Sequence, residues 1–186
     1  MAFSDKAAGG PERKRALTTR QTVLLALMVA MAMGLHAVEG LVSYVSPMPG
    51  IRLGLANIVI LICFSFFREG QVFLVTLLRL LLTGLILGTF LTPSFWISAG
   101  GGLLSFGAMA LLNGRREVSV IGVSLAGAAA HNLGQLLAVA ALLASSSVFY
   151  YLPWLLLWSV PMGFLTGFSA KAAIKALRNI GFDGTM

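Results

Sequence analysis

VLLALMVAMAMGLHAVEGLVSYV, residues 23–45, decides the fold, because this long apolar run contains a single charged side chain, Glu39. A helix needs about 20 apolar residues to cross the hydrocarbon core of a bilayer. The residues before the run are polar and mixed in charge, and the segment SPMPG at 46–50 ends it. The stretch therefore predicts a transmembrane helix that follows a polar tail.

Five further apolar runs follow, and short polar, glycine- or proline-containing segments separate them. We expect helices at about 51–67, 71–90, 95–112, 118–144 and 151–170. Of the 186 residues, 58% are hydrophobic and 10% are charged, whereas a soluble domain carries roughly 25% charged residues. The prediction is an all-α membrane protein in contact with the lipid bilayer. Its transmembrane domain, a bundle of six helices, would occupy residues 21–172, between tails at 1–20 and 173–186.

Lysine and arginine are unevenly distributed between the two sides that six crossings would create. Eleven of the 13 fall on the side of the N-terminal tail, Arg79 lies within a predicted helix, and Arg52 falls on the other side. Cytoplasmic loops carry an excess of these residues, so both termini are predicted to be cytoplasmic. This distribution also accounts for the net charge of +7, and no nucleic acid is expected as a partner.

Ionisable and amide side chains interrupt the apolar runs. An ionisable group inside a bilayer is costly unless it is paired or hydrated, so each marks a candidate site. At about 100° per residue, Glu39 shares a helix face with His36, Arg79 continues a stripe of threonines, and His131 aligns with Gln135. The candidate substrate-binding residues are Glu39, Arg52, Asn57, Arg79, His131, Asn132 and Gln135.

If the helices alternate in direction, these candidates lie between the midplane and the outer face. Two arginines against one glutamate give the predicted cavity a surplus positive charge. Guanidinium groups pair with oxyanions in bidentate fashion, so we expect a small anionic or phosphate-bearing ligand. The alternative is structural: Glu39 pairs with Arg52 or Arg79, while His131 and its neighbours form hydrogen bonds between helices.

Small residues recur every four positions in the first predicted helix, at Ala26, Ala30 and Gly34. This spacing lets two helices approach closely. By helical angle, the three residues lie roughly opposite Glu39. They either pack within the bundle or dock a partner subunit.

Motifs for autonomous catalysis are absent from the sequence. It contains no G-x-x-x-x-G-K-[ST] phosphate-binding loop, and its two aspartates, Asp5 and Asp183, lie near the ends of the chain. No cluster of carboxylates is therefore available for a metal, and Cys63 is the single cysteine. We expect no catalytic residue, no metal and no cofactor.

Four stretches together carry a family resemblance: SPMPGIRLGLAN at 46–57, SAGGGLLS at 98–105, IGVSLAGAAAHNLGQ at 121–135, and YLP at 151–153. They resemble the bacterial membrane family called Gx transporters, also labelled heptaprenyl diphosphate synthase component I. That family is similar in size and layout to the S components of energy-coupling factor transporters. S components are six-helix substrate-binding proteins with an outward-facing site.

The resemblance implies two functions and leaves both open. The first is the substrate-binding subunit of an importer for a micronutrient or isoprenoid-like ligand, in a bacterial cell membrane. Ala26 and Ala30 match the Ala-x-x-x-Ala motif that docks S components on a transmembrane coupling subunit, which works with ATPase subunits. The second is a non-catalytic membrane accessory subunit of polyprenyl diphosphate synthesis.

Overall fold

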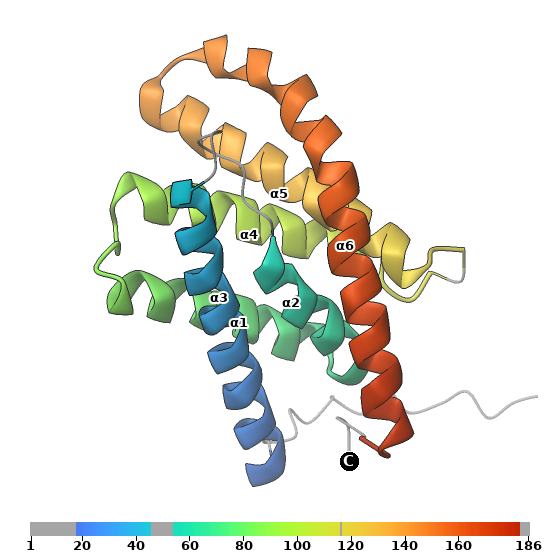
Figure 1. The fold of residues 1–186 in the computed structure, drawn as a ribbon. Helices are drawn as coiled ribbons and strands as arrows, with labels where there is room; N and C mark the ends of the chain where they lie inside the picture. Colours follow the sequence, from blue (N-terminus) through green and yellow to red (C-terminus); the bar gives the residue numbers. More distant parts are fainter. Residues whose placement is uncertain (1–17, 46–53, 116, 183–186) are drawn as a thin grey trace, which may run out of the picture.

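The computed structural model describes residues 18–45, 54–115 and 117–182, which form six α-helices and one short 3₁₀ helix (Figure 1). The elements are α1 Thr19–Val45, α2 Leu55–Phe66, α3 Glu69–Ile86, α4 Pro93–Leu112, α5 Val120–Leu143, η1 Ser146–Tyr151 and α6 Leu152–Asn179. These residues include no strand. The predicted all-α fold is confirmed.

Five segments, α1, α3, α4, α5 and η1 with α6, have the length and hydropathy to cross a membrane. By this measure the chain is a multi-pass membrane protein. α2 differs, because its 12 residues extend about 18 Å at 1.5 Å per residue, short of a hydrocarbon core of ~30 Å. We expected a helix at 51–67. In the part of this segment that the structure describes, which begins at residue 54, the helix covers only Leu55–Phe66 and is shorter than predicted.

α2 is the central helix of the bundle. It contacts each of the other five helices, and nine of its 12 residues are buried. An apolar helix of 10–14 residues is more typical of a buried core element than of a membrane span. The other helices, rather than lipid, surround α2.

The start of α1 and the end of α6 lie at the same end of the molecule (Figure 1). We call the half of the bundle at this end the proximal half and the opposite half the distal half. One continuous apolar core lies in the proximal half, where Phe66 of α2 packs edge-on against Phe182 at 5.1 Å between ring centroids. The core residues are Leu25, Met28, Val29, Ala32, Val59, Ile60, Leu61, Ile62, Cys63, Phe64, Phe66, Phe67, Val72, Val75, Met109, Val123, Ala170 and Ile174.

Glycines hold α4, α5 and α6 close together. A Cβ atom added at Gly100 of α4 would lie 2.7 Å from the carbonyl oxygen of Gly134 in α5. On the other side of α5, a Cβ at Gly163 of α6 would lie 2.9 Å from the Cα of Leu125. These positions accept only a hydrogen atom, so the backbones approach as closely as small residues allow in membrane helices.

Candidate functional site

Charged, amide and imidazole side chains are buried in the distal half of the bundle. They lie in the last third of α1, the first turn of α2, the second half of α3 and the middle of α5. Each is less than 10% exposed: Glu39, Asn57, Arg79, His131, Asn132 and Gln135. The structure thus buries all six of these predicted residues within the bundle. Arg52, the seventh, lies outside the described residues.

Arg79 lies on a buried face of α3. Thr76, Arg79 and Thr83 are 0%, 3% and 7% exposed, so the stripe expected from helical spacing is present. The Thr76 hydroxyl donates to the carbonyl of Val72 within its own helix, at 2.9 Å. A glycine of α4 makes room for the arginine, since a Cβ at Gly102 would lie 3.0 Å from an amino nitrogen of Arg79.

A small pocket of about 20 Å³, with polar and apolar lining residues, adjoins Arg79 at the junction of α1, α3 and α4. Its lining residues are His36, Arg79, Leu80, Thr83, Gly84, Thr89, Phe95 and Ser98. The hydroxyl oxygen of Thr83 is buried and has no hydrogen-bond partner among the residues that the structure describes. A cavity needs about 10–15 Å³ to hold one water, so this pocket has room for a water beside Thr83. An organic ligand would need the surrounding helices or loops to move.

His131 and Gln135 form a pair one helical turn apart on α5. Their Nε2 atoms are 3.1 Å apart. Both pack on Gly101, where an added Cβ would lie 3.0 Å from His131 Nδ1 and 2.7 Å from Gln135 Cγ. Gly101 and Gly102 are adjacent in α4, so the glycine run places Arg79 of α3 and the His131–Gln135 pair of α5 against one turn of the same helix.

Glu39 connects α1 to the start of α2. Its carboxylate accepts a hydrogen bond from the backbone N–H of Gly54, the residue that precedes α2. Gly54 adopts a left-handed conformation with φ of 70°, which favours glycine. Asn57 is close by, with its Nδ2 3.5 Å from the position of a Cβ at Gly54. Glu39 therefore has a structural contact, its hydrogen bond with Gly54. Among the described residues, Glu39 is not part of the lining of the pocket beside Arg79.

Asn132 connects α5 to α6 rather than lining the pocket. Its side-chain amide donates to the carbonyl of Leu155 at 2.9 Å. Nearer the proximal end, the hydroxyls of Ser124 and Thr166 join the same two helices at 2.9 Å. The interhelical hydrogen bonds of the alternative interpretation are thus present at Asn132.

The small-residue stripe of α1 faces outward. Ala26, Ala30 and Gly34 are exposed, and a Cβ at Gly34 would meet no described atom within 4 Å. The neighbouring Val23 and Leu27 are 62% and 53% exposed. Of the two uses expected for the stripe, packing within the bundle is not seen among the described residues.

The family described as heptaprenyl diphosphate synthase component I matches residues 28–173. This chain belongs to that family. The match runs from the first half of α1 into the last third of α6 and includes every predicted substrate-binding residue. No curated protein and no solved structure matches the chain. The resemblance to the heptaprenyl diphosphate synthase component I family is confirmed, and the similarity to S components stays a prediction.

In this member of the component I family, sequence reasoning missed two polar residues of the pocket, Thr89 and Ser98. Thr89 lies in the connection after α3, where no helical periodicity indicates which side chains face the site. Ser98 had a signal, because it precedes the glycine run at 100–102 that packs on the site. Within the described ranges, no group of three or more His, Cys, Asp or Glu residues is placed to hold a metal ion.

Proposed function

We propose that this chain is the membrane-embedded, substrate-binding subunit of an importer of the energy-coupling-factor type. The observation that supports it is the concentration of buried polar groups around Arg79 in the distal half. A guanidinium carries five N–H donors in a planar fork, so a protein neighbour and a bound oxyanion can share it. The ligand is a small anionic or phosphate-bearing molecule, of the micronutrient or isoprenoid-like class.

The exposed stripe of α1 supports a partner in the membrane. Ala26, Ala30 and Gly34 form a shallow path on which a second helix can lie closely. The chain has no phosphate-binding loop for ATP, so a coupling subunit would connect it to ATPase subunits. Replacing Ala26 and Ala30 with leucine should abolish co-purification with these partners and leave ligand binding intact. Ala172→Leu, at another exposed alanine, is the matched control, and equal loss in the control would contradict docking through α1.

The proposed orientation puts the proximal half at the cytoplasm and the distal half outside, in the cell membrane of a bacterium. Of the seven lysines and arginines in the described ranges, all but Arg79 lie in the proximal half: Arg20, Arg68, Arg115, Lys171, Lys175 and Arg178. This asymmetry is the cytoplasmic signature. Cysteines introduced at Ser146 and at Gly114 should be labelled from outside intact cells at Ser146 only. Labelling of Gly114 would reverse the orientation.

The family's name favours a second function, a non-catalytic membrane accessory subunit of polyprenyl diphosphate synthesis. A diphosphate is also an oxyanion, so Arg79 suits either function. The two differ in what the assembled complex does. ATP-dependent uptake into proteoliposomes supports the importer, whereas stimulation of a prenyl-transferring partner in the absence of ATP supports the accessory subunit.

Ligand binding by Arg79 is the decisive test. The purified protein is titrated with flavin mononucleotide, thiamine monophosphate and farnesyl diphosphate, and native mass spectrometry identifies any ligand that it retains. For the ligand that binds, Arg79→Leu should weaken affinity by roughly 10- to 150-fold, the loss of a charge-assisted contact of about 1.5–3 kcal/mol. The variant should remain folded, and Arg68→Leu, at an exposed arginine, is the control.

The structural alternative makes the opposite prediction for the same variant. If Arg79 is chiefly the partner of Glu39, Arg79→Leu strands a buried carboxylate and lowers the free energy of unfolding by about 3–5 kcal/mol. Adding Glu39→Gln should then restore stability. A rescued double variant that also recovers ligand binding would show that Arg79 does not contact the ligand.

A further inference from the structure

A second pocket, an order of magnitude larger than the one beside Arg79, opens in the proximal half. Its volume is about 240 Å³, and it lies between the end of α2 and the connection from α4 to α5. The lining residues are Leu61, Phe64, Ser65, Asn113, Gly114, Arg115, Val118, Val120 and Val123. This pocket is at the opposite end of the bundle from the proposed substrate site, so an inference from it does not depend on that site.

The lining divides into an apolar interior and a polar rim. Leu61, Phe64 and Val123 are 3%, 7% and 6% exposed, so they form the interior. Arg115 is exposed and Asn113 is half-buried, so these two stand at the rim. A site with this division suits a molecule that has one polar end and one apolar end.

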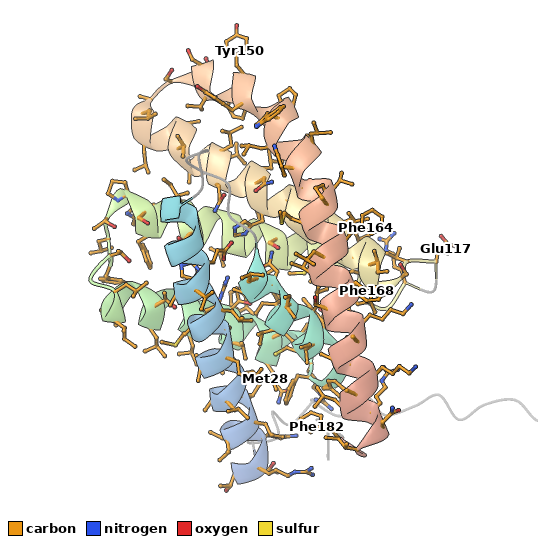
Figure 2. All side chains as sticks on the ribbon, in the orientation of Figure 1. Met28, Glu117, Tyr150, Phe164, Phe168 and Phe182 are labelled. Carbon is orange, nitrogen blue, oxygen red and sulfur yellow. The ribbon has the colours of Figure 1, made fainter. Side chains whose placement is uncertain are left out.

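The polar rim is held in place. Arg115 Nε donates to the carbonyl of Leu111 at 3.0 Å, which fixes the guanidinium and leaves its two amino groups without a bond to another described residue. Gly114, with φ of 80°, reverses the chain between Asn113 and Arg115. Glu117, the next described residue along this connection, points away from the bundle (Figure 2). The tethered amino groups can therefore pair with an oxyanion in bidentate fashion.

The charge around the rim favours an anion. The proximal half exposes six described cations against the carboxylates of Glu69 and Glu117. A surface with this excess raises the local concentration of anions. The positive-inside rule accounts for the cations alone, but it does not account for a pocket of this size, with an apolar interior, beneath one of them.

We propose that this proximal pocket binds an anionic amphiphile. Arg115 and Asn113 hold its phosphate or diphosphate headgroup, and Leu61, Phe64 and Val123 contact the first carbons of its apolar tail. At about 30 Å³ for each water, the volume accommodates a phosphate and several methylene groups. The headgroup belongs either to a membrane lipid or to a free amphiphile, and the two share this chemistry.

The test uses the full chain in nanodiscs of zwitterionic phosphatidylcholine, with dodecyl phosphate as the probe. Inorganic phosphate presents the headgroup alone, and dodecanol presents the tail alone. Dodecyl phosphate should bind at least about tenfold more tightly than either. Equal binding of inorganic phosphate, or equal binding of dodecanol, would overturn the proposal, because each shows that one half of the pocket is not used.

Two variants locate the binding. Arg115→Gln should weaken dodecyl phosphate binding about tenfold or more, as expected for the loss of a charge-assisted hydrogen bond. Val120→Phe, at a half-buried lining residue, should block the pocket without removing charge. The matched control is Arg178→Gln, which removes an exposed cation of the same half outside the pocket and should change affinity less than about twofold. Equal losses in Arg115→Gln and Arg178→Gln would show general surface attraction and overturn the proposal.

A lipid titration distinguishes the two sources of the headgroup. Phosphatidylglycerol in the nanodisc should compete with dodecyl phosphate if the natural occupant is a membrane lipid. If dodecyl phosphate binds equally tightly in nanodiscs with and without phosphatidylglycerol, the natural occupant is a free amphiphile. Either result supports the proposal when Arg115→Gln weakens binding and Arg178→Gln does not, and a result in which no variant changes binding overturns it.

Discussion

The two halves of this bundle use buried space differently. The proximal half contains a continuous apolar core, and its charges lie at the exposed ends of helices. The distal half buries an arginine, a glutamate, a histidine and three amides. Polar groups inside a membrane are expensive and usually serve a function. The comparison indicates that the apolar core of the proximal half stabilises the fold, and that this stability offsets the free-energy cost of burying polar groups in the distal half.

The buried polar residues of the proximal half and the bundle centre support this comparison, because they are hydroxyls. Three of these hydroxyls, on Thr76, Ser124 and Thr166, bond to a carbonyl of their own helix or to one another. A hydroxyl satisfied in this way adds little to the energy of helix association. Substitutions in the proximal core should therefore change stability and leave ligand binding at the distal site unchanged, and those around Arg79 should do the reverse.

The largest loss of stability is expected in the proximal core. Ile60 of α2 is 1% exposed, and Ile60→Ala should lower the free energy of unfolding by about 2–5 kcal/mol because it leaves a cavity. Unfolding in detergent, followed by circular dichroism, measures the change. Ile86→Ala is the control, because Ile86 is 71% exposed and should tolerate the change. Similar losses in both would mean that the proximal core does not dominate stability.

A smaller loss is expected where α4 crosses α5. Gly100→Ala places a methyl group 2.7 Å from the carbonyl oxygen of Gly134, and neither backbone can yield cheaply. Overpacking of this kind costs about 1–3 kcal/mol. Gly107→Ala in the same helix meets no described atom within 4 Å, and it should be neutral or stabilising by up to ~1 kcal/mol. The same thermal or denaturant measurement compares the two, and a neutral Gly100→Ala would show that the crossing is not tight.

The smallest effect is expected at the hydroxyl pair between α5 and α6. Ser124→Ala removes its bond to Thr166, yet Thr166 still donates to the carbonyl of Met162 at 2.9 Å. Hydrogen bonds between membrane helices average about 0.6 kcal/mol. A double-mutant cycle with Thr166→Val should give a coupling energy of this size. A coupling above about 2 kcal/mol would make the pair a main contributor, and the contrast between the two halves would weaken.

Helical spacing predicted much of this arrangement. The apolar runs indicated the all-α membrane fold, and the stripes through Arg79 and through His131 and Gln135 are buried as expected. These features depend on local periodicity, which a sequence displays directly.

The features that spacing could not predict depend on contacts between helices. An apolar segment looks the same whether protein or lipid surrounds it, so the central position of α2 was hidden. Asn132 is adjacent to the His131 stripe, but a rotation of about 100° turns it toward Leu155 of α6. The contacts of Gly101 and Gly102 with side chains of two other helices likewise require knowledge of which helices are neighbours.

The central position of α2 has a consequence for biosynthesis. Ribosomes make α2 second and α6 last, yet α2 contacts both α1 and α6. A helix of about 18 Å is too short to span the hydrocarbon core unaided. The contacts between α2 and α6 cannot form until α6 has left the ribosome. During most of translation, α2 therefore lacks part of the protein surface that surrounds it in the finished bundle.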